Sequence, residues 1–170
     1  MTISLYFGPY NDPGDANFPP THHWDWPHAP DCHNPAFTIT RSTNPDQSIS
    51  LSIALTVRNI TNATVNADFV KLYAAACGLL NSPADVNLLA GTILSNAAPI
   101  HTWSVGLGDS MAVPARSDVQ DSFWSPASGA VAWGVPPYAS GFILVAVLQA
   151  PGQLVQNNYT GDPSVAIWLG

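Results

Sequence analysis

Residues 49–58 read Ile-Ser-Leu-Ser-Ile-Ala-Leu-Thr-Val-Arg, and this stretch decides the fold class. A large apolar side chain occupies every second position from Ile49 to Val57, and Ser, Ala, Thr and Arg stand between them. Alternation with a period of two places the apolar side chains on one face of an extended chain. The stretch therefore predicts a β-strand with one buried face.

A second strand is predicted at Phe69–Cys77, with Val70 and Leu72 on one face and Lys71 and Tyr73 on the other. Because residues 59–66 between the two patterns are rich in turn formers, we expect the two strands to be adjacent elements. Four further strands are predicted at Leu88–Leu94, Ser110–Trp124 (interrupted by Pro114), Phe142–Leu148 and Ser164–Leu169. Phe142–Leu148 is apolar at every position, which predicts a central strand buried on both faces.

The composition agrees with an all-β protein. Hydrophobic residues make up 46% of the 170 residues and charged residues only 9%. All acidic residues are Asp and Lys71 is the only Lys, so good helix formers are scarce and helix is expected to be minor. A net charge of −7 without a basic cluster makes nucleic acid and anionic membranes poor partners. No stretch approaches the roughly 20 apolar residues of a membrane span.

Two regions are distinguished by composition. Residues 1–35 form a Pro- and aromatic-rich N-terminal arm with little regular structure expected, and residues 36–170 form the sandwich domain. Aromatic side chains of the arm are candidates for contacts with a subunit, a protein partner or the apolar face of a sugar ring. The candidate binding residues are Trp24, Trp26, Tyr10 and Phe18.

The arm also holds two candidate metal sites. A transition metal such as zinc prefers imidazole, carboxylate and thiolate ligands, and four of the five histidines cluster here. These candidates are His22, His23, Asp25, His28 and His33. A calcium loop would use the oxygen atoms of Asp12, Asp15 and Asn17 around a glycine turn. An Asx-rich turn and an extended arm need no ion, so the cofactor stays open between calcium, zinc and none.

Cys32 and Cys77 are the only cysteines. In a β-rich chain of low charge they form either one disulfide or two buried thiols, and the sequence leaves both alternatives open.

The spacing of short motifs resembles that of bacterial immunoglobulin-like sandwich domains of the cell-adhesion-related (CARDB-like) kind. The motifs are Ala29-Pro30-Asp31, Val57-Arg58-Asn59, Asn62-Ala63, Val70-Lys71-Leu72-Tyr73, Trp124-Ser125-Pro126, the Phe142–Leu148 strand and Gln156-Asn157-Asn158. The resemblance implies an immunoglobulin-like antiparallel β-sandwich of about seven strands that acts as a spacer, adhesion module or assembly part. Gln153 and Gln156 stand where such domains commonly have acidic residues, which removes support for a calcium site there.

Catalysis is not expected. Gly108-Asp109-Ser110 with His101 is similar to the start of an esterase block, but nothing helical follows Ser110, so the motif favours a hairpin turn. We therefore expect a non-catalytic structural, assembly or adhesion protein, located outside the cell, on its surface or in a particle. The arm would mediate contacts in a homo-oligomer or with a protein partner. The alternative is a monomeric carbohydrate- or metal-dependent binding module that uses the Trp- and His-rich arm.

Overall fold

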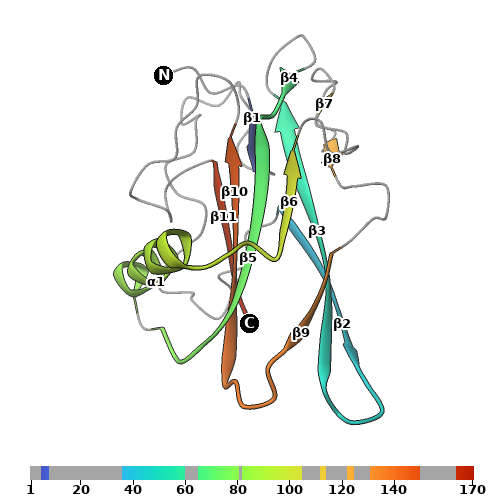
Figure 1. The fold of residues 1–170 in the computed structure, drawn as a ribbon, viewed down its shortest axis with the longest axis vertical. Helices are drawn as coiled ribbons and strands as arrows, with labels where there is room; N and C mark the ends of the chain where they lie inside the picture. Colours follow the sequence, from blue (N-terminus) through green and yellow to red (C-terminus); the bar gives the residue numbers. More distant parts are fainter. Residues whose placement is uncertain are drawn as a thin grey trace.

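The computed structural model of the chain describes residues 5–7, 36–59, 65–80, 82–104, 112–113, 122–124, 131–149 and 164–170. Two antiparallel β-sheets pack face to face (Figure 1). Sheet A contains β1 (Leu5–Phe7), β2 (Phe37–Thr43), β3 (Ile49–Asn59), β8 (Ser122–Trp124) and β9 (Val131–Val135). Sheet B contains, in spatial order, β11 (Val165–Leu169), β10 (Gly141–Gln149), β5 (Phe69–Cys77) and β6 (His101–Ser104). A small third sheet pairs β4 (Val65–Asn66) with β7 (Ala112–Val113).

The predicted all-β architecture with little helix is confirmed, and so are four of the strands. β3, β5, β10 and β11 cover the patterns that predicted them. β10 lies inside sheet B between β5 and β11, and Phe142 to Leu148 are buried without interruption. The predicted strand over residues 110–124 is represented by β7, which ends before Pro114, and by β8.

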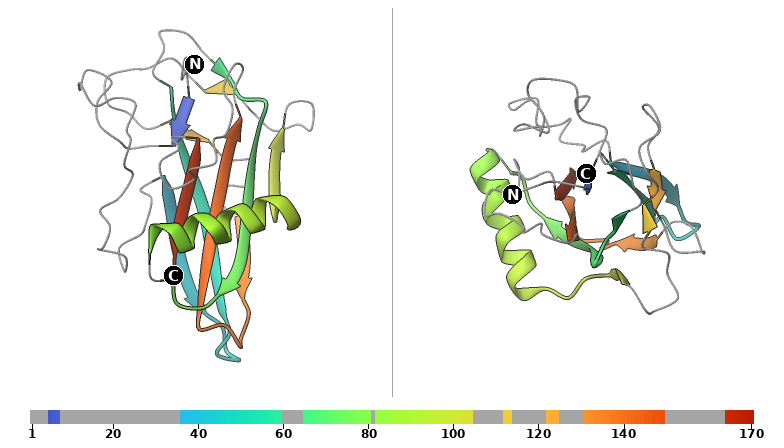
Figure 2. Two further views of the ribbon diagram at one scale, coloured as in Figure 1. Left: turned by 90° about the vertical axis from the view of Figure 1, so that its left-hand side faces the viewer. Right: turned by 90° about the horizontal axis from the view of Figure 1, so that it is seen from above.

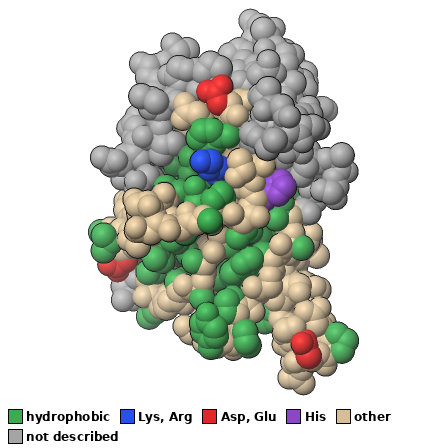
Figure 3. Space-filling model, in the orientation of Figure 1, with side chains coloured by type: hydrophobic (Ala, Val, Ile, Leu, Met, Phe, Trp, Pro, Cys, Tyr) green, Lys and Arg blue, Asp and Glu red, His purple; other side chains and the backbone are tan. Residues whose placement is uncertain are grey.

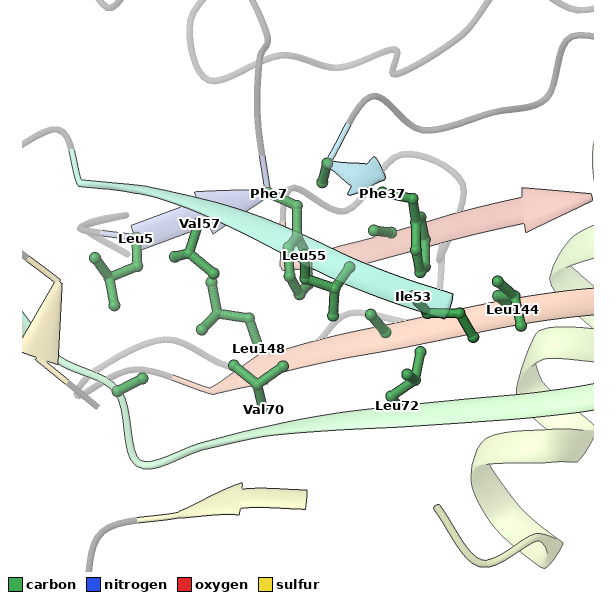
Figure 4. Packing of buried hydrophobic residues seen from close by; sticks show 14 of the residues in the cluster. Leu5, Phe7, Phe37, Ile53, Leu55, Val57, Val70, Leu72, Leu144 and Leu148 are labelled. Atoms are coloured by element: carbon green, nitrogen blue, oxygen red, sulfur yellow. The ribbon is translucent and has the colours of Figure 1, made fainter. Parts of the chain in front are cut away.

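The prediction that β3 and β5 are adjacent strands is wrong. β5 pairs with β10 and β6 in sheet B, whereas β3 lies in sheet A. The two strands instead stack, and their apolar faces meet in one core (Figure 4). Leu55 and Val57 of β3 face Val70 and Leu148 of sheet B across this layer. The alternation of apolar residues shows which face of a strand is buried. Two strands have the same alternation whether they are hydrogen-bonded neighbours in one sheet or lie in opposite sheets.

The predicted strand at Leu88–Leu94 is also wrong, because these residues lie in helix α1 (Pro83–Asn96). Ser82 caps the helix: its hydroxyl accepts a hydrogen bond from the backbone N–H of Asp85 at 3.2 Å, and Pro83 follows at the first helical position. Val86 and Ile93 lie on the buried face and pack on sheet B, which α1 crosses on its outer side (Figure 2). Among the described residues, no helix is long and apolar enough to cross a membrane.

β1 and β2 lie end to end along the same side of β3. Leu55 is paired with Phe37 of β2 and, on its other side, with Trp124 of β8. Val57 is paired with Phe7 of β1 and also with β8, so β1 must lie on the side where β2 lies. Phe7 and Phe37 are thus two strand positions apart, about 7 Å between their Cα atoms, although 29 residues separate them in sequence.

A tight hairpin joins β2 to β3. The backbone N–H of Asn44 donates to the carbonyl of Ser48 at 2.8 Å, and that of Gln47 donates to the carbonyl of Asn44 at 2.8 Å. Gln47 has φ of 67°, the left-handed conformation that closes a turn of this kind. The carboxylate of Asp46 accepts hydrogen bonds from the hydroxyl and the backbone N–H of Ser48, which lowers the pKa of Asp46. These bonds fix the register of the two strands.

Candidate functional site

An apolar groove of about 500 Å³ opens at one end of sheet B. It is formed where β5 ends, where β10 begins and where β11 ends, at a point where three distant parts of the chain meet. Its lining residues are Cys77, Gly78, Leu79, Leu80, Ser140, Gly141, Phe142, Leu169 and Gly170. Hydrophobic side chains gather on this face of the molecule, over β5 and β10 (Figure 3).

The floor of the groove depends on a glycine. Gly170 and Phe142 exchange two backbone hydrogen bonds, of 3.0 and 3.1 Å. A Cβ atom on Gly170 would lie only 2.0 Å from Cζ of Phe142, so the aromatic ring packs directly on the Gly170 backbone. On another side the Phe142 ring meets Trp133 edge to face, with ring centroids 5.9 Å apart. The ring is therefore held between Gly170, which follows β11 of sheet B, and Trp133 of sheet A, and it lines the groove.

The chemistry of the groove is that of an apolar contact. Cys77 is half-buried and forms no disulfide with another described residue, and burial raises the pKa of its thiol, so the reactive thiolate is scarce at neutral pH. Of the lining side chains, that of Leu79 is 87% exposed. Across the parts of the chain that the structure describes, no three His, Cys, Asp or Glu side chains lie close enough to hold a metal ion.

The reactivity of Cys77 follows from its burial. We expect iodoacetamide to alkylate Cys77 at pH 7.5 at least about tenfold more slowly than a free cysteine in an unstructured peptide. The rate should rise with pH well beyond 8.5, the ordinary pKa of a thiol. Mass spectrometry of the tryptic peptides gives the rate at Cys77 separately from Cys32. Equal rates in the folded protein and in 6 M urea would contradict the prediction.

The same burial predicts a loss of stability in alkali. Burial raises the pKa of Tyr73 as it does that of Cys77, so both groups hold their protons more tightly in the folded state. The contribution of the two groups to the free energy of unfolding is fully present below their pKa values in the unfolded chain, about 8.5 and 10. It is lost as the pH rises past these values towards the folded ones, so alkali should lower the free energy of unfolding.

Most of the predicted site residues lie outside the described residues. This applies to the aromatic candidates Trp24, Trp26, Tyr10 and Phe18, and to both sets of metal-ligand candidates in the arm. Cys32 lies there too, so a disulfide with Cys77 stays a prediction. Of the hydrolase alternative, His101 begins β6 and is half-buried, whereas Asp109 and Ser110 are not described. The groove was not predicted, because its residues share no sequence motif and meet only through the pairing of β10 with β5 and β11.

Comparisons of the chain with models of protein families, with curated proteins and with solved structures find no match.

Proposed function

We propose that this chain is a non-catalytic β-sandwich of the immunoglobulin-like type that serves in assembly or adhesion, and that residues 8–35 make its contacts with subunits or partners. One observation carries the proposal. Both ends of this Pro- and aromatic-rich segment are joined to one side of β3, at neighbouring positions of a rigid sheet. Binding residues on many proteins are carried in this way by connections between scaffold strands.

The order of the strands supports the immunoglobulin-like type. When strands that lie in line are counted as one, sheet A has three positions and sheet B has four. Lettered along the chain, the first sheet is A-B-E and the second is G-F-C-D. A constant-type immunoglobulin domain has A-B-E-D and G-F-C, so the two arrangements differ in the sheet that carries the fourth strand. This way of counting, which leaves out β4 and β7, gives seven strand positions in the two large sheets.

The composition of residues 8–35 supports a contact role. Tryptophan and tyrosine are enriched among the residues that dominate binding energy at protein interfaces, and this segment contains Trp24, Trp26 and Tyr10. Prolines restrict the backbone before binding, which reduces the entropy that a partner must remove. Fixed ends reduce it further, since both Phe7 and Phe37 are buried in the core.

A monomeric carbohydrate- or metal-dependent binding module is the second candidate. The observation that favours it is that β1 and β2 belong to the same chain's sheet, which keeps the aromatic and histidine side chains tethered to their own sandwich. In this case Trp24, Trp26 and the histidines would form the site, with zinc or calcium as the ion.

The test is deletion of residues 8–35, so that Phe7 is joined directly to Ala36. A deletion that starts at Met1 would also remove Leu5 and Phe7 from the core, whereas this one leaves β1 in place. Ala36 then takes the strand position opposite Thr56. A second variant replaces residues 8–35 by Gly-Ser-Gly, in case the direct junction is too short.

We expect cooperative unfolding to be retained while the assembled mass, measured by light scattering, falls. An unchanged assembly in the deletion variant would overturn the role of residues 8–35 as the assembly contact. A mass of 18.0 kDa for the intact chain with and without chelator, together with glycan binding, would favour the binding module instead.

A further inference from the structure

Within the described part of the chain, the outer edge of β2 is unpaired. Among the residues that the structure describes, β2 pairs with β3 on one side and with no strand on the other. Five of its seven residues are exposed, namely Thr38 and the four residues from Thr40 to Thr43. Only Phe37 is buried. β2 borders the lower half of the molecule in Figure 1. An edge of this length, rich in Thr and free of Pro, Gly and Lys, is a template for strand addition.

The hairpin determines which backbone groups point outward. Asn44 and Ser48 are a hydrogen-bonded pair, and bonded pairs alternate along an antiparallel ladder. The pairs of Ser42 with Ser50 and of Thr40 with Ser52 are therefore bonded as well. It follows that the N–H and C=O groups of Phe37, Ile39, Arg41 and Thr43 point away from β3, towards the open edge.

The other edges of the two sheets are less suitable. β6 has four residues, and β9 contains Gly134 and runs into Pro136. β11 has five residues, and its Trp168 packs edge to face on Phe37. β2 is the longest of the four edges.

We propose that β2 pairs antiparallel with β2 of a second copy of this chain, about a two-fold axis through Thr40. This register places Ile39 opposite Arg41 of the second copy and Phe37 opposite Thr43, so every outward-pointing group finds a partner. It forms about eight hydrogen bonds between the copies. An axis through Arg41 would oppose two like charges and shorten the overlap, which costs energy.

The side chains fit this pairing. Thr38, Thr40 and Ser42 lie on the outer face of sheet A, where no large side chain of β2 obstructs the partner strand. The two Thr40 residues meet as a non-hydrogen-bonded pair, and Thr–Thr pairs across strands are favourable. Joining two β2 strands would merge the two copies of sheet A into one continuous sheet. Pairing through β2 rests on the proposed assembly role, for which it supplies a second copy of the chain as the partner. The contact surface is β2 and not residues 8–35.

Cysteine cross-linking tests the register. In a chain with Cys32→Ser and Cys77→Ala, Thr40→Cys places two thiols across the axis with Cα atoms about 4.5 Å apart, within the range of a disulfide. The matched control Ser42→Cys leaves its two copies about 14 Å apart. We expect mild oxidation to convert most of the Thr40→Cys protein to a covalent dimer and to leave the Ser42→Cys protein without a covalent cross-link. Equal cross-linking of both variants, or of neither, would overturn the proposal.

A second pair of variants tests the edge itself. Arg41→Pro removes an outward N–H and blocks the edge while it leaves every bond between β2 and β3. Arg41→Ala removes the same side chain and leaves the edge open. We expect sedimentation to give about twice 18.0 kDa for the wild type and for Arg41→Ala, and 18.0 kDa for Arg41→Pro. A monomeric wild type at 0.5 mM, or a dimeric Arg41→Pro protein, would overturn the proposal.

The deletion of residues 8–35 separates the two proposals. A dimer that survives the deletion and is lost in Arg41→Pro supports pairing through β2 and counts against the segment as the assembly contact. A dimer that is lost on deletion and survives in Arg41→Pro supports the segment and overturns pairing through β2.

Discussion

Substitution of Phe7 by Ala is expected to lower the free energy of unfolding by about 3–5 kcal/mol. Phe7 is fully buried and is one of the largest side chains of the core, although it belongs to a strand of only three residues near the N-terminus. It points into the layer between the sheets, beside Leu55 (Figure 4). Its removal leaves a cavity that strands anchored by long ladders cannot collapse to fill.

Urea unfolding followed by fluorescence measures this loss as a lower midpoint with an unchanged slope. Tyr138→Ala is the matched control, because it removes an aromatic ring that is 85% exposed, and it should change the free energy by less than about 0.5 kcal/mol. Similar values for the two variants would mean that β1 does not form part of the core.

The sequence predicted the strands whose own pattern determines their structure. In β3 the alternation from Ile49 to Val57 defines the buried face, and the continuous apolar stretch of β10 shows burial on both faces. β1 was not predicted, because three residues are too few to show the alternation of apolar and polar side chains that indicates a strand. Its place is set by pairing with residues 57–59, which are far away in sequence.

Helix α1 shows a different kind of failure. Ser82, Pro83 and Asp85 together form a helix start, and the positions of Val86, Ala90 and Ile93 have the spacing of a helix face. Without this start, the short apolar run Leu88–Leu94 has the pattern of a strand. The sequence therefore contains the signal for the start of the helix. It contains no pattern that decides whether β3 and β5 pair in one sheet or stack in opposite sheets.

The candidate site was less predictable than the fold. The predicted metal ligands and aromatic binding residues lie in residues 10–33, where His, Asp and aromatic residues are concentrated in the sequence. The apolar groove and the open edge of β2 depend instead on the ends and the order of strands, which a local pattern does not contain. The edge in particular could be identified only after the hairpin at Asn44 had fixed the direction of the backbone groups.

Substitution of Ile143 by Asp is expected to abolish folding at pH 7 and 25 °C. Ile143 is fully buried in the layer between sheet B and α1, among Val86, Val145 and Ile167. On this face Lys71 is paired with Val147, four residues along β10 from Ile143, and its Nζ lies over the Phe69 ring. A carboxylate placed there loses its hydration without gaining a partner, at a cost of several kcal/mol. Domains of this size are stable by only about 5–15 kcal/mol, and the lost packing of Ile adds to the deficit.

Near-ultraviolet circular dichroism and urea unfolding report the result. Ile143→Val should cost only about 0.5–1.5 kcal/mol, because it removes one methylene group and introduces no charge. Burial raises the pKa of an Asp, so the defect of Ile143→Asp should be smaller at pH 4, where more of the carboxyl group is protonated, than at pH 7. A variant that folds at pH 7 with near-normal stability would show that α1 does not cover this face of β10. Because α1 is the element that the sequence failed to predict as a helix, this substitution tests the packing that distinguishes the structure from a sandwich of strands alone.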